Sequence, residues 1–329
     1  MKDSYNFAPL RSFNPYMTKS CILNTIAGLA LLISSCNSSS KESQKTVAGK
    51  LSFDSIIGIK YYEVKRRFST GLSFNELGFQ QEPTWIIQFK SQDTIQAYSP
   101  QKKRMQSFYL HYDHGEVYNF AKEWFKIKKI SKDSMVFQRL HLKGKEISKD
   151  IRSDVNITWY AEDYIKNVLK TTAAALQRPT KADTLYILKL AEKSNRNPDN
   201  RDSAFAGRQP VEFIPRSKMI SVKKISTVDK LNGRTESYDY LFPRYRIDIV
   251  KAYDNFGYEF SAVVDEKGKI HLGSFRVDFP ENYEPRKKTL EAIINVYLQN
   301  LLQVIPGKTL GISHSSEINI IVTGRKNRQ

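Results

Sequence analysis

A short apolar run near the start of the chain limits which residues can belong to a folded domain. Residues 21–33 are apolar except for Asn24 and Thr25 among them. A helix that crosses a bilayer needs about 20 apolar residues. This run is shorter and fits the apolar core of a secretory signal peptide, with residues 17–20 as its positive start. We therefore expect Met17 to be the true first residue. A buried core helix is the alternative interpretation.

The end of this run carries a recognisable motif. Residues 31–36 read Leu-Leu-Ile-Ser-Ser-Cys and are followed by a polar, Ser-rich stretch. The motif resembles the lipobox of bacterial lipoproteins. The resemblance implies that residues 1–35 are a signal peptide and that Cys36 is acylated, for example with palmitate, as the mature N-terminus. It also implies an outer-membrane lipoprotein in the cell envelope, on the periplasmic or the surface face. Residues 36–49 would be its lipidated tether.

Cysteine content and charge agree with export. The only cysteines are Cys21 and Cys36, so the mature chain has no free thiol, which suits an oxidising periplasm. The formal charge is +18, and loss of Lys2, Arg11, Lys19 and Asp3 with the leader lowers it to +16. Such a charge attracts anionic partners. For an exported protein these are the membrane and anionic envelope polymers, and we expect no nucleic acid.

The pattern of apolar residues predicts an α+β fold. Residues 50–150 read as short strands separated by turn residues, typical of an antiparallel sandwich or barrel. Residues 151–194 are expected to be a helical connector, with helices over 161–176 and 185–191. Residues 195–244 contain a very polar stretch and are predicted to be a loop-rich linker.

Residues 245–329 have the clearest pattern. Alternating apolar residues over 258–264 and 270–275 flank the turn at 265–268, where Gly268 suits a left-handed conformation. Apolar residues then recur on one face of a predicted helix over 287–303. A last strand over 316–322 follows, and we expect it to lie at a sheet edge. The predicted domain is thus an antiparallel sheet with one packed helix.

This order of elements resembles the C-terminal domain of TonB. The matching segments are residues 263–270, the helix that begins at Thr289, and residues 305–308 leading to 317–320. The resemblance implies the same small α+β fold. A lipid would replace the transmembrane anchor of TonB itself.

Few clusters have the residue types that chemistry needs, and we expect no metal, cofactor or catalytic site. A turn through Asp113-His114-Gly115 would separate the ligand-type residues around it, because alternate strand residues face opposite ways. His314 lies beside serines but has no orienting acid in sequence, and His141 and His271 are isolated. Residues of the ligand-type cluster are His111, Asp113, His114 and Glu116.

Acidic and aromatic residues leave two further alternatives open. Asp150, Asp154, Glu162 and Asp163 gather near the start of a predicted helix, where they would complement the helix dipole. Two of them in one cleft would instead suit a hydrolase. Trp85, Trp124 and Trp159 would line a groove or pack in the core.

These observations favour a membrane-anchored envelope lipoprotein that binds a protein or an anionic envelope component without turnover. The alternative is an envelope hydrolase with its site in the N-terminal domain. We expect binding at the edge of the last strand or at the basic segment Arg286-Lys287-Lys288.

Overall fold

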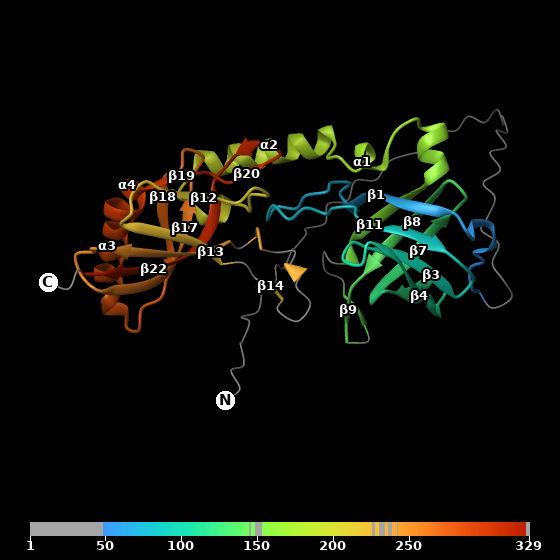
Figure 1. Cartoon of the computed structure of the whole chain (residues 1–329), viewed down its shortest axis with the longest axis horizontal. Helices are drawn as coiled ribbons and strands as arrows, with labels where there is room; N and C mark the ends of the chain where they lie inside the picture. Colours follow the sequence, from blue (N-terminus) through green and yellow to red (C-terminus); the bar gives the residue numbers. More distant parts are fainter. Residues whose placement is uncertain are drawn as a thin grey trace, which may run out of the picture. The chain divides into compact units, whose positions relative to one another are not determined.

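The computed structural model describes residues 49–144, 146–148, 153–225, 228–229, 234–235, 239–241 and 243–326 (Figure 1). The predicted signal peptide, Cys36, the predicted tether up to residue 48 and Asp150 lie outside the described residues. The α+β class is confirmed, with a large β-rich region first and a sheet with one packed helix at the C-terminal end. No helix of the described ranges is long and apolar enough to cross a bilayer.

The N-terminal region is a nine-stranded antiparallel sheet with its own core. Its strands follow the predicted alternation, and on β11 every second residue from Val155 to Ala161 is buried. The order is β4-β3-β2-β1-β11-β8-β7-β6-β5. The strands are β1 Lys60–Phe68, β2 Ile86–Phe89, β3 Thr94–Ser99, β4 Arg104–Tyr109, β5 His111–His114, β6 Val117–Phe120, β7 Glu123–Ile130, β8 Ser134–Leu140 and β11 Val155–Ala161.

This sheet curls back on itself. Its two edge strands, β4 and β5, are consecutive in the chain and separated only by Leu110, which is fully buried. A flat sheet of nine strands would hold its edges about 40 Å apart. The Trp85 ring before β2 also packs against Phe120 on β6 and Phe125 on β7, with ring centres 5.7 and 6.0 Å away. The curled sheet therefore has an enclosed inner face, as a barrel has.

The expected connector at 151–194 differs from the prediction. It begins with β11, a central strand of the curled sheet. The predicted helix over 161–176 is broken, because only a π-helical turn at Tyr164–Val168 and α1 at Ala173–Leu176 form. Lys170 between them has a φ of 49°, which ends a right-handed helix. The short element predicted at 185–191 is part of the longer α2, Lys181–Arg196.

The C-terminal region is a five-stranded sheet in the order β13-β16-β22-β17-β18. The predicted hairpin is confirmed, and Gly268 in its turn has a φ of +80°, where an L side chain would be strained. The strands are β13 Ile220–Ile225, β16 Arg244–Val250, β17 Phe256–Val264, β18 Ile270–Phe275 and β22 Ser316–Arg325.

One long helical segment packs against this sheet, as Figure 1 shows. It comprises α3 Tyr283–Ile293, a π-helical turn Ile294–Leu298 and α4 Gln299–Leu301, and thus starts and ends earlier than the predicted 287–303. Leu290, Ile293, Ile294 and Leu298 of the predicted stripe are buried in the core of the sheet. Leu302 already belongs to β19, Leu302–Ile305.

Three details of the C-terminal prediction are wrong. The last strand, β22, is central and pairs with β16 and β17 on its two sides, so it offers no free edge. Its pairing with β16 is parallel, which makes the sheet mixed rather than antiparallel. The segment 195–244, expected to be a linker, supplies β13 and also β12, Glu212–Pro215, which pairs with β19. The remaining short pairs are β9 Leu142–Lys143 with β10 Glu146–Ile147, β14 Val228–Asp229 with β15 Arg234–Thr235, and β20 Lys308–Thr309 with β21 Ile312–Ser313.

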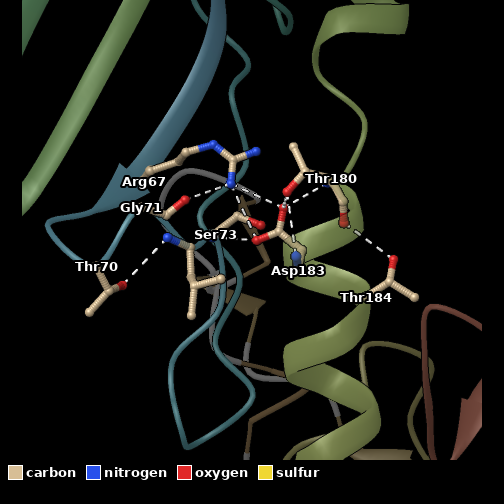
Figure 2. A network of polar contacts seen from close by, with 8 residues as sticks. Arg67, Thr70, Gly71, Ser73, Thr180, Asp183 and Thr184 are labelled. Carbon is tan, nitrogen blue, oxygen red and sulfur yellow. Dashed lines mark hydrogen bonds and ion pairs between the residues drawn. The ribbon is translucent and has the colours of Figure 1, made fainter.

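Helix α2 is tied to the loop after β1 by a buried polar network, shown in Figure 2. Thr180 and Asp183 form a capping box at the helix start. Asp183 also accepts a hydrogen bond from the backbone N–H of Ser73 at 2.8 Å and pairs with Arg67. Beside this network, Phe74 packs with Ile187 and other apolar residues in a small third core.

Candidate functional site: an arginine-lined pocket

A pocket of about 340 Å³ opens beside the inner face of the curled sheet. We call it the arginine pocket. Its charged lining residues are Arg66 on β1, Glu82, Glu123 on β7, Arg139 on β8 and Arg208. Charged side chains on the inner face of a sheet are unusual, since that face otherwise carries the core. The arginine pocket is therefore the candidate functional site.

Strand register explains why two of these arginines face inward. Arg66 lies opposite Ile157 on β11, and Arg139 lies opposite Val155 of the same strand. Directly opposed residues share a face of the sheet. Because Val155 and Ile157 are core residues, Arg66 and Arg139 point to the inner side as well.

A β-bulge creates the first ion pair of the pocket. In a regular strand, residues 63 and 66 would face opposite sides. The register shift between Glu63 and Lys65 inserts an extra residue and brings Glu63 and Arg66 onto one face. Arg66 then donates from Nε and Nη2 to the two Glu63 oxygens at 2.5 and 2.9 Å.

Glu63 positions an aromatic wall as well as an arginine. Its fully buried carboxylate accepts hydrogen bonds from the backbone N–H groups of Thr84 and Trp85, both at 3.0 Å. Trp85 lines the pocket. One buried carboxylate therefore holds both the Arg66 guanidinium and the segment that carries the Trp85 ring.

The second pair joins neighbouring strands. Arg139 donates from Nε and Nη2 to the Glu123 carboxylate at 2.8 and 2.9 Å. Both side chains are about one-third exposed, at 33% and 30%. Such a bidentate pair fixes the plane of the guanidinium group while leaving it accessible to a ligand.

The third pair comes from a loop outside the curled sheet. Arg208 donates from Nη2 to Glu82 at 2.5 Å, and its guanidinium group lies 4.1 Å from the centre of the Tyr240 ring. The Tyr240 hydroxyl accepts a hydrogen bond from the backbone N–H of Gln80. Burial raises the pKa of Tyr240 further above neutral pH.

The ligand-type residues at the β5–β6 hairpin do not converge on one metal site. His111, Asp113 and His114 are exposed at the β5–β6 hairpin, where His114 Nδ1 lies 2.5 Å from Asp113 Oδ2. Glu116 follows in the same turn. In the parts of the chain that the structure covers, no group of three or more His, Cys, Asp or Glu could hold a metal.

The remaining histidines have structural surroundings. His314 is fully buried, stacks on Phe205 and contacts Thr309 Oγ1 through Nε2 at 3.1 Å. Burial lowers its pKa to about 4. His271 lies 2.9 Å from Asp265. The backbone N–H of His141 donates to Ser153 Oγ.

The acidic residues near residue 160 have separate partners. Asp154 accepts from Ser69 Oγ at 2.5 Å, Glu162 pairs with Lys166 at 2.6 Å, and Asp163 is exposed. Of the tryptophans, Trp159 is fully buried in the core and Trp124 half-buried on β7, while Trp85 lines the arginine pocket.

The pocket arginines were not predicted from the sequence, although the strand pattern contains one sign of them. Met135, Phe137 and Arg139 alternate along β8, so a charge stands at a position where the pattern requires an apolar residue. Glu123 stands in the same way before Phe125 and Ile127 on β7. For Arg66 the bulge hides this signal.

The comparisons with known proteins identify no family for this chain. No protein-family model matches the sequence, and no curated protein matches it.

Proposed function

We propose that the protein is an envelope lipoprotein, anchored by a lipid on Cys36, that binds an anionic envelope component in the arginine pocket. The observation that carries the proposal is the set of three arginines with ordered guanidinium groups around one accessible pocket. Guanidinium groups are the usual partners of carboxylates and phosphates. The positive charge of the whole chain would raise the local concentration of such a component.

The targeting part of the proposal rests on the motif that ends at Cys36 and on the Ser-rich residues after it. The similarity of the C-terminal region to TonB is also a proposal, supported by the order of β17, β18, the packed helix and β22. Binding at the edge of β22 is not part of it, because β22 is central.

The test is capture of polymer from an envelope extract by the immobilised full-length protein. Arg139→Gln should lower the amount of anionic glycan retained by about tenfold, because charge-assisted hydrogen bonds are lost. Arg104→Gln removes an equal charge from an exposed position outside the pocket and serves as the matched control. Equal retention by the wild type and Arg139→Gln would refute the pocket as the site. Equal losses in both variants would point to general surface charge.

A hydrolase is the second candidate, because Glu82 and Glu123 line the same pocket. Two carboxylates at one cleft are the usual requirement for glycoside hydrolysis. The test is release of reducing ends from envelope polysaccharide. Release that Glu123→Gln abolishes would replace the binding proposal with this one.

A further inference from the structure

The arginine pocket keeps hydrogen-bond donors in reserve. A guanidinium group has five N–H donors in one plane. Arg66 and Arg139 each use Nε and Nη2 for their own glutamate. Among the described residues nothing else bonds to the edge between Nη1 and Nη2, whose parallel pair of N–H groups fits a carboxylate bidentately. The glutamates therefore orient the two arginines without using up their capacity for an anion.

The two arginines flank the same strand. Arg66 and Arg139 lie on either side of β11, opposite Ile157 and Val155. Strands two apart are about 10 Å apart. Both arginines line the same pocket, so one anionic group bound there would have both as neighbours.

Charge balance limits how many negative charges the pocket favours. Arg66, Arg139 and Arg208 are matched by Glu63, Glu82 and Glu123. The six charges cancel formally, so a dense polyanion gains little inside the pocket. A ligand with one carboxylate can still use the free arginine edges.

The rest of the lining suits a sugar ring. Gln80, Gln81 and Thr84 offer amide and hydroxyl groups. The Glu82 carboxylate pairs with Arg208 through Oε1 but is about half exposed, so it can accept a further hydrogen bond. Sugar hydroxyls both donate and accept, and therefore match such a mixed wall. Trp85 supplies aromatic surface for the apolar side of a ring. A volume of about 340 Å³ is at the lower end of small-molecule pockets.

We propose that the arginine pocket binds an acidic sugar, with the carboxylate on the free edges of Arg66 and Arg139 and the ring beside Trp85. This inference rests on the proposed function and names its ligand class. The unit would be one residue of an acidic envelope glycan.

Four probes test it on the full-length protein by titration calorimetry. Glucuronate has both ring and carboxylate, glucose only the ring, acetate only the carboxylate, and N-acetylalanine a carboxylate on a peptide-like body. Glucuronate should bind about tenfold more tightly than each of the others. Arg139→Gln should weaken glucuronate about tenfold and leave glucose unchanged, while Arg104→Gln changes neither.

A thermal melt of each variant separates lost binding from lost folding. If Arg139→Gln melts early, Trp85→Phe serves as the second variant and should weaken glucuronate and glucose alike. Glucose binding as tightly as glucuronate would overturn the role of the carboxylate, and N-acetylalanine binding as tightly would overturn the sugar. If no probe binds but glycan capture from extract depends on Arg139, this inference fails while the proposed function stands. If capture does not depend on Arg139, the proposed function fails.

Discussion

Arg67 and Asp183 lie 116 residues apart in the chain, yet Arg67 Nη1 lies 3.0 Å from Asp183 Oδ2. Asp183 is fully buried and also accepts hydrogen bonds from the N–H groups of Ser73 and Thr180 (Figure 2). Burial alone would raise the pKa of Asp183, but these hydrogen bonds outweigh it and lower the pKa to about 2. The charged carboxylate is thus required to fasten the start of α2 to the end of β1.

Asp183→Asn should destabilise the protein by about 3–5 kcal/mol, because it removes the fully buried carboxylate that pairs with Arg67 and accepts from Ser73 and Thr180. Urea unfolding would measure the change. Glu162→Gln removes a carboxylate from the exposed pair with Lys166 and should change stability by at most about 1 kcal/mol.

The lowered pKa of Asp183 predicts a loss of stability in acid. Its folded pKa, about 2, is below the ordinary value of 3.8, so its contribution is complete above pH 3.8 and disappears as the pH falls towards 2. The shift corresponds to about 2 kcal/mol. Asp183→Asn should lack this part of the acid transition. If the unfolding free energy of the mutant fell with pH as steeply as that of the wild type, Asp183 would not be the group responsible.

The lowered pKa of His314 predicts a second loss of stability, at a higher pH than that of Asp183. Its folded pKa of about 4 is below the ordinary 6.5, since burial disfavours the imidazolium. The unfolded chain therefore binds the extra proton, and stability is complete above pH 6.5 and falls as the pH drops from 6.5 to 4. The expected loss is about 3 kcal/mol. The difference in unfolding free energy between pH 7 and pH 4.5 should be smaller in His314→Gln than in the wild type.

Ile294→Asp should unfold the C-terminal sheet region. Ile294 is 2% exposed within the helix–sheet core, and an unpaired charge there costs about 3–5 kcal/mol. Val296→Asp changes the same helical turn at a side chain that is 57% exposed and should have little effect. Similar melting of the two variants would show that the helix does not dock through Ile294.

Ile320→Pro belongs to the same group of C-terminal variants. Because β22 pairs on both sides, proline should disrupt the sheet itself rather than weaken a partner at an edge.

Cys36→Ala should release the protein from the membrane fraction and abolish labelling with a fatty acid. A single myristoyl chain gives only marginal binding, on the order of 10⁴ M⁻¹, so stable anchoring would need more than one acyl chain. A variant that still labels and sediments with membranes would refute the lipoprotein proposal.

Local pattern was sufficient where an element depends on its own residues. The hairpin of β17 and β18 with Gly268, and the apolar stripe from Leu290 to Leu298, could be predicted because each needs only a period and a turn residue. The break of the predicted helix near Lys170 could not be predicted. The apolar spacing through residues 164–169 also fits an unbroken helix whose outer residues remain exposed.

The sequence by itself thus determined the strand and helix periods, the α+β class and the charge of this protein. Tertiary structure decided which strands pair, and with that the central place of β22 and the burial of His314. It also decided the arginine pocket, because Glu63 and Arg66 share a face only through a bulge, and Arg139 and Arg208 arrive from distant segments. Periodicity is a property of neighbours along the chain, whereas pairing order and bulges depend on contacts between residues far apart in sequence.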